Sequence, residues 1–159
     1  MTTKNTDLVA NFEATPQVAN NAAELAGVIR TANGTVELAA GDSTDDDIVM
    51  LAPIPSNASI PQLFVGADEL GGSCTYNVGL YKTDGTVKDE DVFATAVDVP
   101  AALADLRFEV ADLNTGSQKL WELAGDSTDP GGYFYVAVTF SATGGTAGTM
   151  NWNIHYIVD

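Results

Sequence analysis

A six-residue run, Ala-Gly-Asp-Ser-Thr-Asp, occurs twice in this chain, at 40–45 and at 124–129. Carboxylates beside hydroxyls and backbone carbonyls are oxygen ligands of the kind that Ca²⁺ prefers. The candidate calcium ligands are therefore Asp42, Asp45, Asp126 and Asp129. The same residue types also form turns, because their side chains hydrogen-bond to the local backbone. Neither copy has the Asp-x-Asp-x-Asp-Gly spacing of a calcium loop, so two similar turns are the favoured interpretation and no metal is assigned.

The residues that could take part in catalysis are few. His155 is the single histidine, and no Ser or Cys nucleophile is placed beside it by the sequence. Cys74, the single cysteine, has no base or positive charge nearby in sequence that would activate its thiol. There is no phosphate-binding glycine loop and no pair of cysteines or histidines at zinc spacing. The sequence therefore predicts a non-enzymatic protein without a catalytic residue or a cofactor.

The element expected to organise the chain is its last quarter. Along 133–140 an apolar residue recurs at every second position, as it does again along 150–158. This period is typical of strands with one buried face. We expect the two strands to form a long hairpin around the small-residue loop 141–148. Such a hairpin needs a partner sheet to cover its apolar face, which favours a β-sandwich.

The rest of the body adds strands and short helices. Strands are expected at 35–39 after an Asn33-Gly34 turn, at 48–52, at 59–65, at 75–81 before an Asp84-Gly85 hairpin turn, and at 106–110. Pro53 and Pro55 should end the second of these strands. Helices are expected at 89–97, which starts with three acidic residues, and at 117–125, between Ser117 and Gly125. The expected fold class is all-β: a jelly-roll-like sandwich with one or two short helices.

The charge balance excludes some partners. Six basic against 22 acidic residues give a formal charge of −16. No basic stripe is present to neutralise phosphates, so neither nucleic acid nor an anionic membrane surface is an expected partner. No apolar run approaches the roughly 20 residues of a membrane span, and no secretory leader is recognisable. The chain is therefore expected to be made in a cytoplasm.

The first 33 residues differ from the body. Their apolar residues recur with no sustained period, and only a weak helix is indicated at 21–26. One interpretation is a floppy terminus. The other is an extended arm that orders on a neighbouring protein, because Phe12, Leu25, Val28 and Ile29 are more apolar than a linker requires. The expected division is an arm at 1–33 and a sandwich domain at 34–159, with these four residues as interface candidates.

The body resembles a group of tailed-bacteriophage virion proteins that are encoded beside the major capsid protein and are associated with capsid decoration. The resemblance is carried by the order and spacing of several short runs rather than by one motif. These runs are 39–42, Leu-Ala-Pro-Ile-Pro-Ser-Asn-Ala at 51–58, Asn-Val-Gly-Leu-Tyr at 77–81 with Asp84-Gly85, 91–98, Lys-Leu-Trp-Glu-Leu at 119–123, and 154–158.

The resemblance implies a head decoration or cement protein that binds the outside of a phage capsid in many copies. Its partners would be the major capsid protein and further copies of itself, and its location would be the exterior of the virion. Two alternatives stay open. One is a structural protein of the tail or neck, and the other is a carbohydrate-binding adhesin module, whose site would use Tyr133, Tyr135 and the Asp-rich turns.

Overall fold

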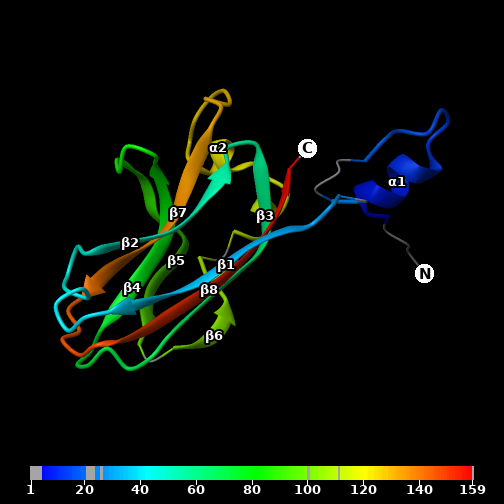
Figure 1. The fold of residues 1–159 in the computed structure, drawn as a ribbon. Helices are drawn as coiled ribbons and strands as arrows, with labels where there is room; N and C mark the ends of the chain where they lie inside the picture. The colour runs from blue at the N-terminus through cyan, green and yellow to red at the C-terminus, as the bar shows by residue number, and fades with distance from the viewer. Residues whose placement is uncertain (1–4, 21–23, 26, 100, 111, 159) are drawn as a thin grey trace.

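The computed structural model describes residues 5–20, 24–25, 27–99, 101–110 and 112–158. Its sandwich consists of two four-stranded sheets, with strand orders β1-β8-β3-β6 and β2-β7-β4-β5 (Figure 1). The strands are β1 (Arg30–Leu38), β2 (Ile48–Pro55), β3 (Ala58–Ala67), β4 (Thr75–Lys82), β5 (Val87–Asp98), β6 (Ala101–Asp105), β7 (Tyr133–Ala142) and β8 (Gly148–Val158). The all-β sandwich expected from the sequence is confirmed.

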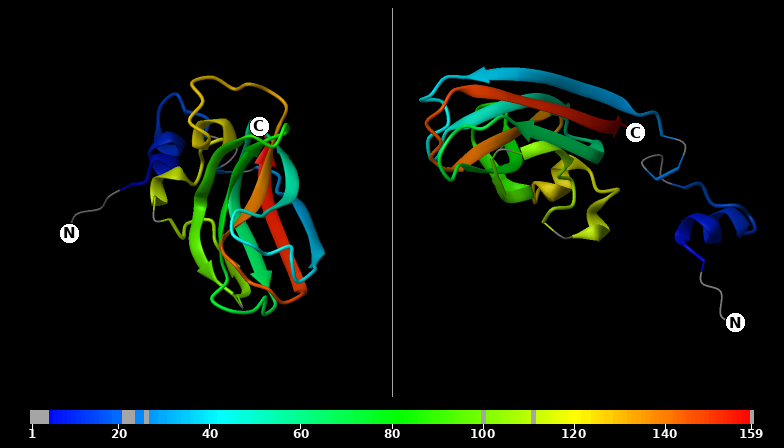
Figure 2. Two further views of the ribbon diagram at one scale, coloured as in Figure 1. Left: turned by 90° about the vertical axis from the view of Figure 1, so that its left-hand side faces the viewer. Right: turned by 90° about the horizontal axis from the view of Figure 1, so that it is seen from below.

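The strand order is that of an eight-stranded jelly roll. The first strand pairs with the last, β2 with β7, β3 with β6, and β4 with β5, all antiparallel. This nested pairing arises when a long antiparallel two-stranded ribbon rolls up. The successive strand pairs then lie alternately in one sheet and in the other. Figure 2 shows the two sheets packed face to face.

The core lies between the sheets and follows the alternation read from the sequence. In β7, Phe134, Val136, Val138 and Phe140 are buried, and in β8 Met150 and Ile154 are fully buried. Other fully buried side chains come from β2, β3, β4, β5 and α2: Ile54, Ile60, Leu63, Val65, Tyr76, Leu80, Phe93 and Leu120. Because both inner faces contribute, each sheet is the apolar partner that the other requires.

The expected hairpin of the last quarter is wrong. Although β7 and β8 are consecutive, β7 pairs with β2 and β4, whereas β8 pairs with β1 and β3. The loop between them therefore crosses from one sheet to the other. Period-2 alternation fixes which residues face the interior, but it does not select the partner strand.

The helix expected at 89–97 is also wrong, since these residues belong to edge strand β5. Its register against β4 is irregular: Val78 pairs with Ala94 but Leu80 pairs with Asp89, so β5 contains extra, bulged residues between these pairs. Ala96, within this strand, has a φ of 50°. A bulge changes which face of the strand the following side chains point to. The apolar residues of 89–97 therefore do not recur at every second position, and their spacing resembled that of a helix.

A turn replaces the strand expected at 106–110. The chain leaves β6 at Asp105, whose carboxylate accepts hydrogen bonds from the backbone N–H groups of Leu63 and Arg107, both at 3.1 Å. The carboxylate thereby takes a position that a strand's carbonyl would fill. Leu106 and Arg107 are both buried, and such adjacent burial is incompatible with a half-exposed strand.

Three smaller boundaries differ as well. Asn33 and Gly34 lie inside β1 rather than in a turn, and a Cβ on Gly34 would come within 2.7 Å of the Trp152 ring. This glycine is therefore needed for close packing. Strand β2 continues through Pro53 to Pro55, which it tolerates because it is an edge strand. The helix expected at 117–125 is the single turn α2 (Leu120–Leu123).

Residues before the sandwich contain a helix that the sequence did not predict, α1 (Asp7–Glu13). The weak helix expected at 21–26 lies largely outside the described residues. Strand β1 begins at Arg30, ahead of the expected boundary between residues 33 and 34.

Gly79→Ala tests the close contact between β4 and the bulged edge strand. A Cβ at Gly79 would overlap the backbone of Asp89 and Glu90, so β5 would have to shift. We expect a loss of about 1–3 kcal/mol in the free energy of unfolding, measured by urea denaturation. Gly41→Ala is the matched control, since that glycine has open space around its Cβ position. Equal stability of the two variants would contradict the observed packing.

Candidate functional site

The N-terminal segment, residues 5–20, folds on itself around α1. The backbone N–H of Val18 donates to the carbonyl of Asn11 at 3.1 Å, and Asn11 Nδ2 donates to Asn20 Oδ1 at 2.8 Å. Asn20 Nδ2 in turn donates to the carbonyl of Leu8 at 3.3 Å. Figures 1 and 2 place this segment beyond the end of the sandwich at which the C-terminus lies. The segment is thus a small folded unit outside the jelly roll rather than a fully extended strand.

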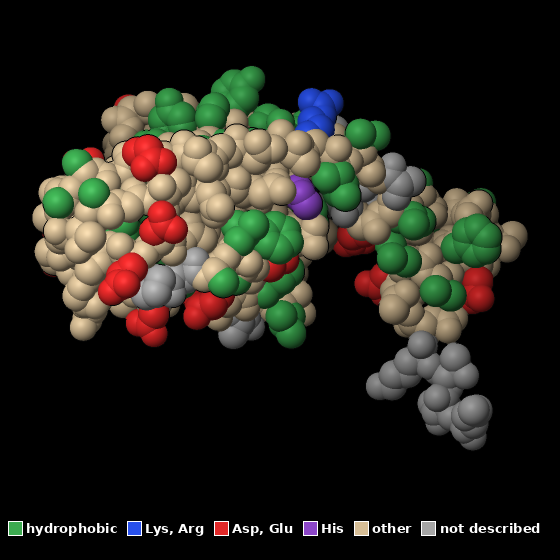
Figure 3. Space-filling model, turned by 60° about the horizontal axis from the view of Figure 1, so that its bottom comes forward, with side chains coloured by type: hydrophobic (Ala, Val, Ile, Leu, Met, Phe, Trp, Pro, Cys, Tyr) green, Lys and Arg blue, Asp and Glu red, His purple; other side chains and the backbone are tan. Residues whose placement is uncertain are grey.

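Several apolar side chains lie at the surface of this segment and of the residues that follow it, among polar and acidic ones (Figure 3). The exposed fractions of the four interface candidates are 68% for Phe12, 52% for Leu25, 75% for Val28 and 57% for Ile29. They are spread along the chain rather than gathered in one pocket. Burying such side chains against a partner would be favourable by about 1.5–3 kcal/mol each.

The structure does not bring the calcium candidates together. Residues 40–45 follow β1, at the end of the sandwich where Ile48 pairs with Thr139. Residues 124–129 precede β7, at the other end, where Pro55 pairs with Tyr133. The two copies of the repeated hexapeptide therefore lie at opposite ends of the molecule and cannot share an ion.

Three of the four candidate carboxylates have partners within the protein, and the backbone N–H of Asp45 donates to Thr143 Oγ1 at 3.1 Å. Asp42 Oδ2 accepts from the backbone N–H of Ala39 at 2.8 Å, and Asp126 forms an ion pair with Lys88 at 2.6 Å. Asp129 Oδ1 accepts from Ser56 Oγ at 2.6 Å and from the Gly131 N–H at 2.9 Å, and these bonds lower the pKa of Asp129. Within the described residues, no group of three or more His, Cys, Asp or Glu side chains could hold a metal ion.

Within the part of the chain that the structure describes, neither the histidine nor the cysteine hydrogen-bonds to a nucleophile or to an acidic or basic side chain. His155 Nδ1 hydrogen-bonds to Gln62 Oε1 at 2.8 Å, and its ring makes an edge contact with Phe64. Cys74 is buried, and burial raises the pKa of its thiol. A thiol in this state is a poor nucleophile.

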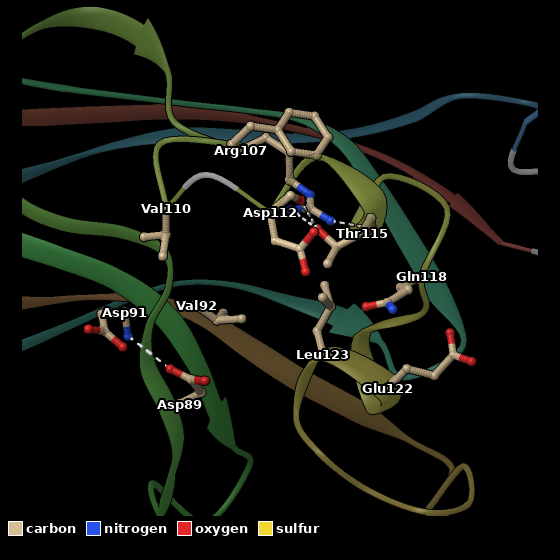
Figure 4. A pocket seen from close by; sticks show the side chains of 11 residues that line it. Asp89, Asp91, Val92, Arg107, Val110, Asp112, Thr115, Gln118, Glu122 and Leu123 are labelled. Atoms are coloured by element: carbon tan, nitrogen blue, oxygen red, sulfur yellow. Dashed lines mark hydrogen bonds between the residues drawn. The ribbon is translucent and has the colours of Figure 1, made fainter.

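The site that the sequence missed is a cleft of about 310 Å³ between β5 and the 106–123 segment (Figure 4). Its lining is mostly acidic and apolar: Asp89, Asp91, Val92, Arg107, Phe108, Val110, Asp112, Thr115, Gln118, Glu122 and Leu123. Burial raises the pKa of Asp89, and the adjacent Asp91 carboxylate acts in the same direction. No sequence signal marks this cleft, because its residues come from four separate runs.

Arg107 forms the floor of the cleft. It is only 2% exposed, and burial lowers its pKa. Its Nε donates to the carbonyl of Ile60 at 2.7 Å, and one terminal nitrogen donates to the carbonyl of Thr115 at 2.6 Å. The guanidinium also lies 4.6 Å from the ring centre of Phe108 and 5.3 Å from that of Phe93. These contacts join the 106–116 loop to β3, which is a structural role.

Arg107→Met tests this role. The substitution keeps much of the side-chain volume but leaves the buried carbonyl of Ile60 and the part-buried carbonyl of Thr115 without their donor. We expect the free energy of unfolding to fall by about 2–4 kcal/mol, because each orphaned buried group costs about 1–3 kcal/mol. Lys82→Met, at an exposed position, should change stability by less than about 0.5 kcal/mol. An Arg107→Met variant as stable as this control would show that the guanidinium bonds contribute nothing.

The fold is similar to chains of two solved phage capsids. A chain in the capsid of Ralstonia phage GP4 superposes with a TM-score of 0.62 and 15% identity, over 84% of this chain and 86% of that chain. A chain in the capsid asymmetric unit of cyanophage Pam1 superposes with a TM-score of 0.52 and 14% identity, over 84% and 86%. At these identities the likeness shows a shared fold. No protein-family profile and no curated protein matches the chain.

Proposed function

We propose that this chain is a non-enzymatic structural protein of a phage virion, and that it decorates the outer surface of the capsid head in many copies. The observation that carries the proposal is the exposure of apolar side chains ahead of the sandwich: Phe12 in the N-terminal segment, and Leu25, Val28 and Ile29 between that segment and β1. Exposed apolar groups on a separate unit are typical of a segment that binds another protein.

The fold supports a virion role. Both chains to which it is similar come from phage capsid structures, and the likeness extends over most of each chain. Jelly rolls also serve as lectin and cupin domains, so the fold alone does not select one function. The exposed N-terminal segment favours the virion role over these other functions. Attachment to a larger shell requires a contact surface outside the buried core, and this segment supplies one.

The negative net charge is consistent with a position outside the shell. A formal charge of −16 disfavours contact with packaged nucleic acid. Among the described residues, no helix is long and apolar enough to cross a membrane. The proposed partners are therefore the major capsid protein and further copies of this chain, and many weak contacts on a symmetric shell would bind tightly through avidity.

Phe12→Asp tests the attachment by the N-terminal segment. Because Phe12 is largely exposed, the variant should keep its fold while losing an apolar contact in the bound state. We expect its affinity for mature, empty heads of the phage that encodes the chain to fall at least about tenfold, in co-sedimentation at moderate salt.

Leu113→Asp is the matched control, since Leu113 is 76% exposed on the sandwich and receives the same charge change. It should bind heads as the unaltered chain does. Full occupancy of heads by Phe12→Asp would contradict attachment through α1. Binding of the unaltered chain to isolated tails but not to heads would indicate a structural protein of the tail or neck instead.

A carbohydrate-binding module is the second candidate, and one observation favours it. Tyr133 is exposed and lines a hollow of about 300 Å³ together with Asp84 and Asp126, beside the 124–129 turn. An aromatic ring beside carboxylates is an arrangement that suits sugar rings and their hydroxyls. Tyr135, the other tyrosine expected at such a site, does not line this hollow.

Glycan-array binding by the unaltered chain would support this second function. Tyr133→Ala should then abolish the signal, because the ring supplies the stacking surface, while Phe12→Asp should leave it unchanged. Absence of binding to any glycan at micromolar protein would remove the module from consideration.

A further inference from the structure

The free edges of the two sheets differ in how well they are protected against pairing with another strand. Four strands lie at sheet edges: β1, β2, β5 and β6. Strand β2 contains two prolines, β5 contains acidic residues and bulges, and β6 is only five residues long. These are the usual devices that prevent edge-to-edge association. Strand β1 has no proline and no bulge, and its charged residues are confined to Arg30 and Glu37 near its two ends.

Strand β1 is instead suited to pairing. It is nine residues long, and only Arg30 and Glu37 are charged, so 31–36 is an uncharged run in a strongly acidic chain. One edge pairs with β8, and the other faces no strand of the described residues. Thr31, Asn33 and Thr35 are exposed. Two acidic copies could therefore approach each other here with less charge repulsion than along β5.

A groove adjoins the C-terminal end of β1. It lies between the edges of β1 and β2 and has a volume of about 400 Å³. Its apolar lining includes Val36, Ile48 and Met50, of which Ile48 and Met50 are among the exposed large side chains of the protein. Its charged lining is entirely acidic and consists of Glu37, Asp42 and Asp47.

The N-terminal end of β1 carries the complementary groups. Val28 and Ile29 are exposed apolar residues that directly precede the strand, and Arg30 is an exposed cation at its first position. One end of β1 thus offers two apolar side chains and a positive charge. The other end offers an apolar groove with carboxylates.

We propose that a second copy of this chain pairs with β1 through its own β1, antiparallel, about a two-fold axis that passes near Asn33. In such a pair, opposite residues lie on the same face of the sheet, so a two-fold axis requires their numbers to give an even sum. With Asn33 opposite itself, the partner's Val28 lies opposite Leu38 and the partner's Arg30 lies opposite Val36. Each copy then sets its apolar pair and its cation beside the other's groove.

This inference deepens the proposed function, because it assigns Val28 and Ile29 to a neighbouring copy and leaves Phe12 for the capsid. It does not require the capsid, and the dimer forms from the isolated full chain. The joined sheets make one continuous eight-stranded sheet across the two copies.

The decisive experiment is cross-linking of Asn33→Cys in the full chain under mild oxidation with oxidised glutathione. Opposite residues of an antiparallel pair have Cα atoms about 4.5–5.5 Å apart, which is within disulfide range. The native Cys74 is buried and should not react. We expect a covalent dimer for Asn33→Cys and none for Ser127→Cys, which lies in the exposed turn after α2.

Sedimentation equilibrium of the full chain, without heads, tests the groove contact. Ile29→Asp should raise the dimer dissociation constant at least about tenfold, because it places a carboxylate beside Glu37 of the other copy. Ser127→Asp, with the same charge change, should leave the constant within about twofold. Cross-linking of Asn33→Cys no faster than that of Ser127→Cys, or equal dimerisation by Ile29→Asp and the unaltered chain, would overturn the inference. A chain that dimerises in this way but does not bind heads would refute the proposed function and leave the dimer standing.

Discussion

Mutual burial of two apolar sheet faces is the constraint on which the rest of this structure depends. Neither sheet could exist alone in water, because Phe134, Val136 and Phe140 of one sheet and Leu63, Met150 and Ile154 of the other need each other for cover. The loops that cross between the sheets are placed by this requirement. So is Arg107, whose guanidinium can leave water only because β3 and the 106–116 loop supply carbonyl acceptors, while Phe108 of that loop and Phe93 of β5 supply two aromatic faces.

Closure of the core also determines where interactions with other proteins can occur. Apolar side chains that fit between the sheets are buried on folding, and several of those left exposed lie ahead of the sandwich or along its open edges. Phe12 and Leu25 precede the first strand, and Ile48 and Met50 lie in an edge strand. The acidic surface disfavours association elsewhere, because each approach of two copies brings many carboxylates together.

Much of the fold could be predicted from the sequence because the apolar residues of several strands recur at every second position. The inward residues of β7 and β8 and the Asp84-Gly85 turn, where the Lys82 N–H donates to the Thr86 carbonyl at 2.8 Å, follow from local rules. Strand partners do not, since the pairing of β8 with β1 joins residues more than a hundred positions apart. The helix expected at 89–97 failed because Asp89 and Asp91 suit both a helix start and a protected edge strand, and only tertiary pairing distinguishes them.

Less of the candidate binding surface than of the fold could be predicted from the sequence. Exposure of Phe12 and Val28 could be anticipated because the apolar residues before the sandwich recur with no sustained period. Helix α1 could not be anticipated, because its seven residues are too few for a helical period to emerge. The cleft above Arg107 had no signal, since its lining depends on how the β5 bulge meets the 106–123 segment. The repeated hexapeptide was conspicuous in sequence, but its copies lie at opposite ends of the sandwich.

The pairing of the first strand with the last has a mechanical consequence. Arg30 lies opposite Tyr156, so the chain enters and leaves the sandwich at the same end, through two neighbouring antiparallel strands. A force that pulls the N-terminal segment away from the C-terminus would break the hydrogen bonds between β1 and β8 one after another, starting at the Arg30–Tyr156 end. A load between the N-terminal segment and the 143–147 loop would instead act along the strands and strain many of these bonds together. The protein therefore resists tension well along its length and poorly between its own termini.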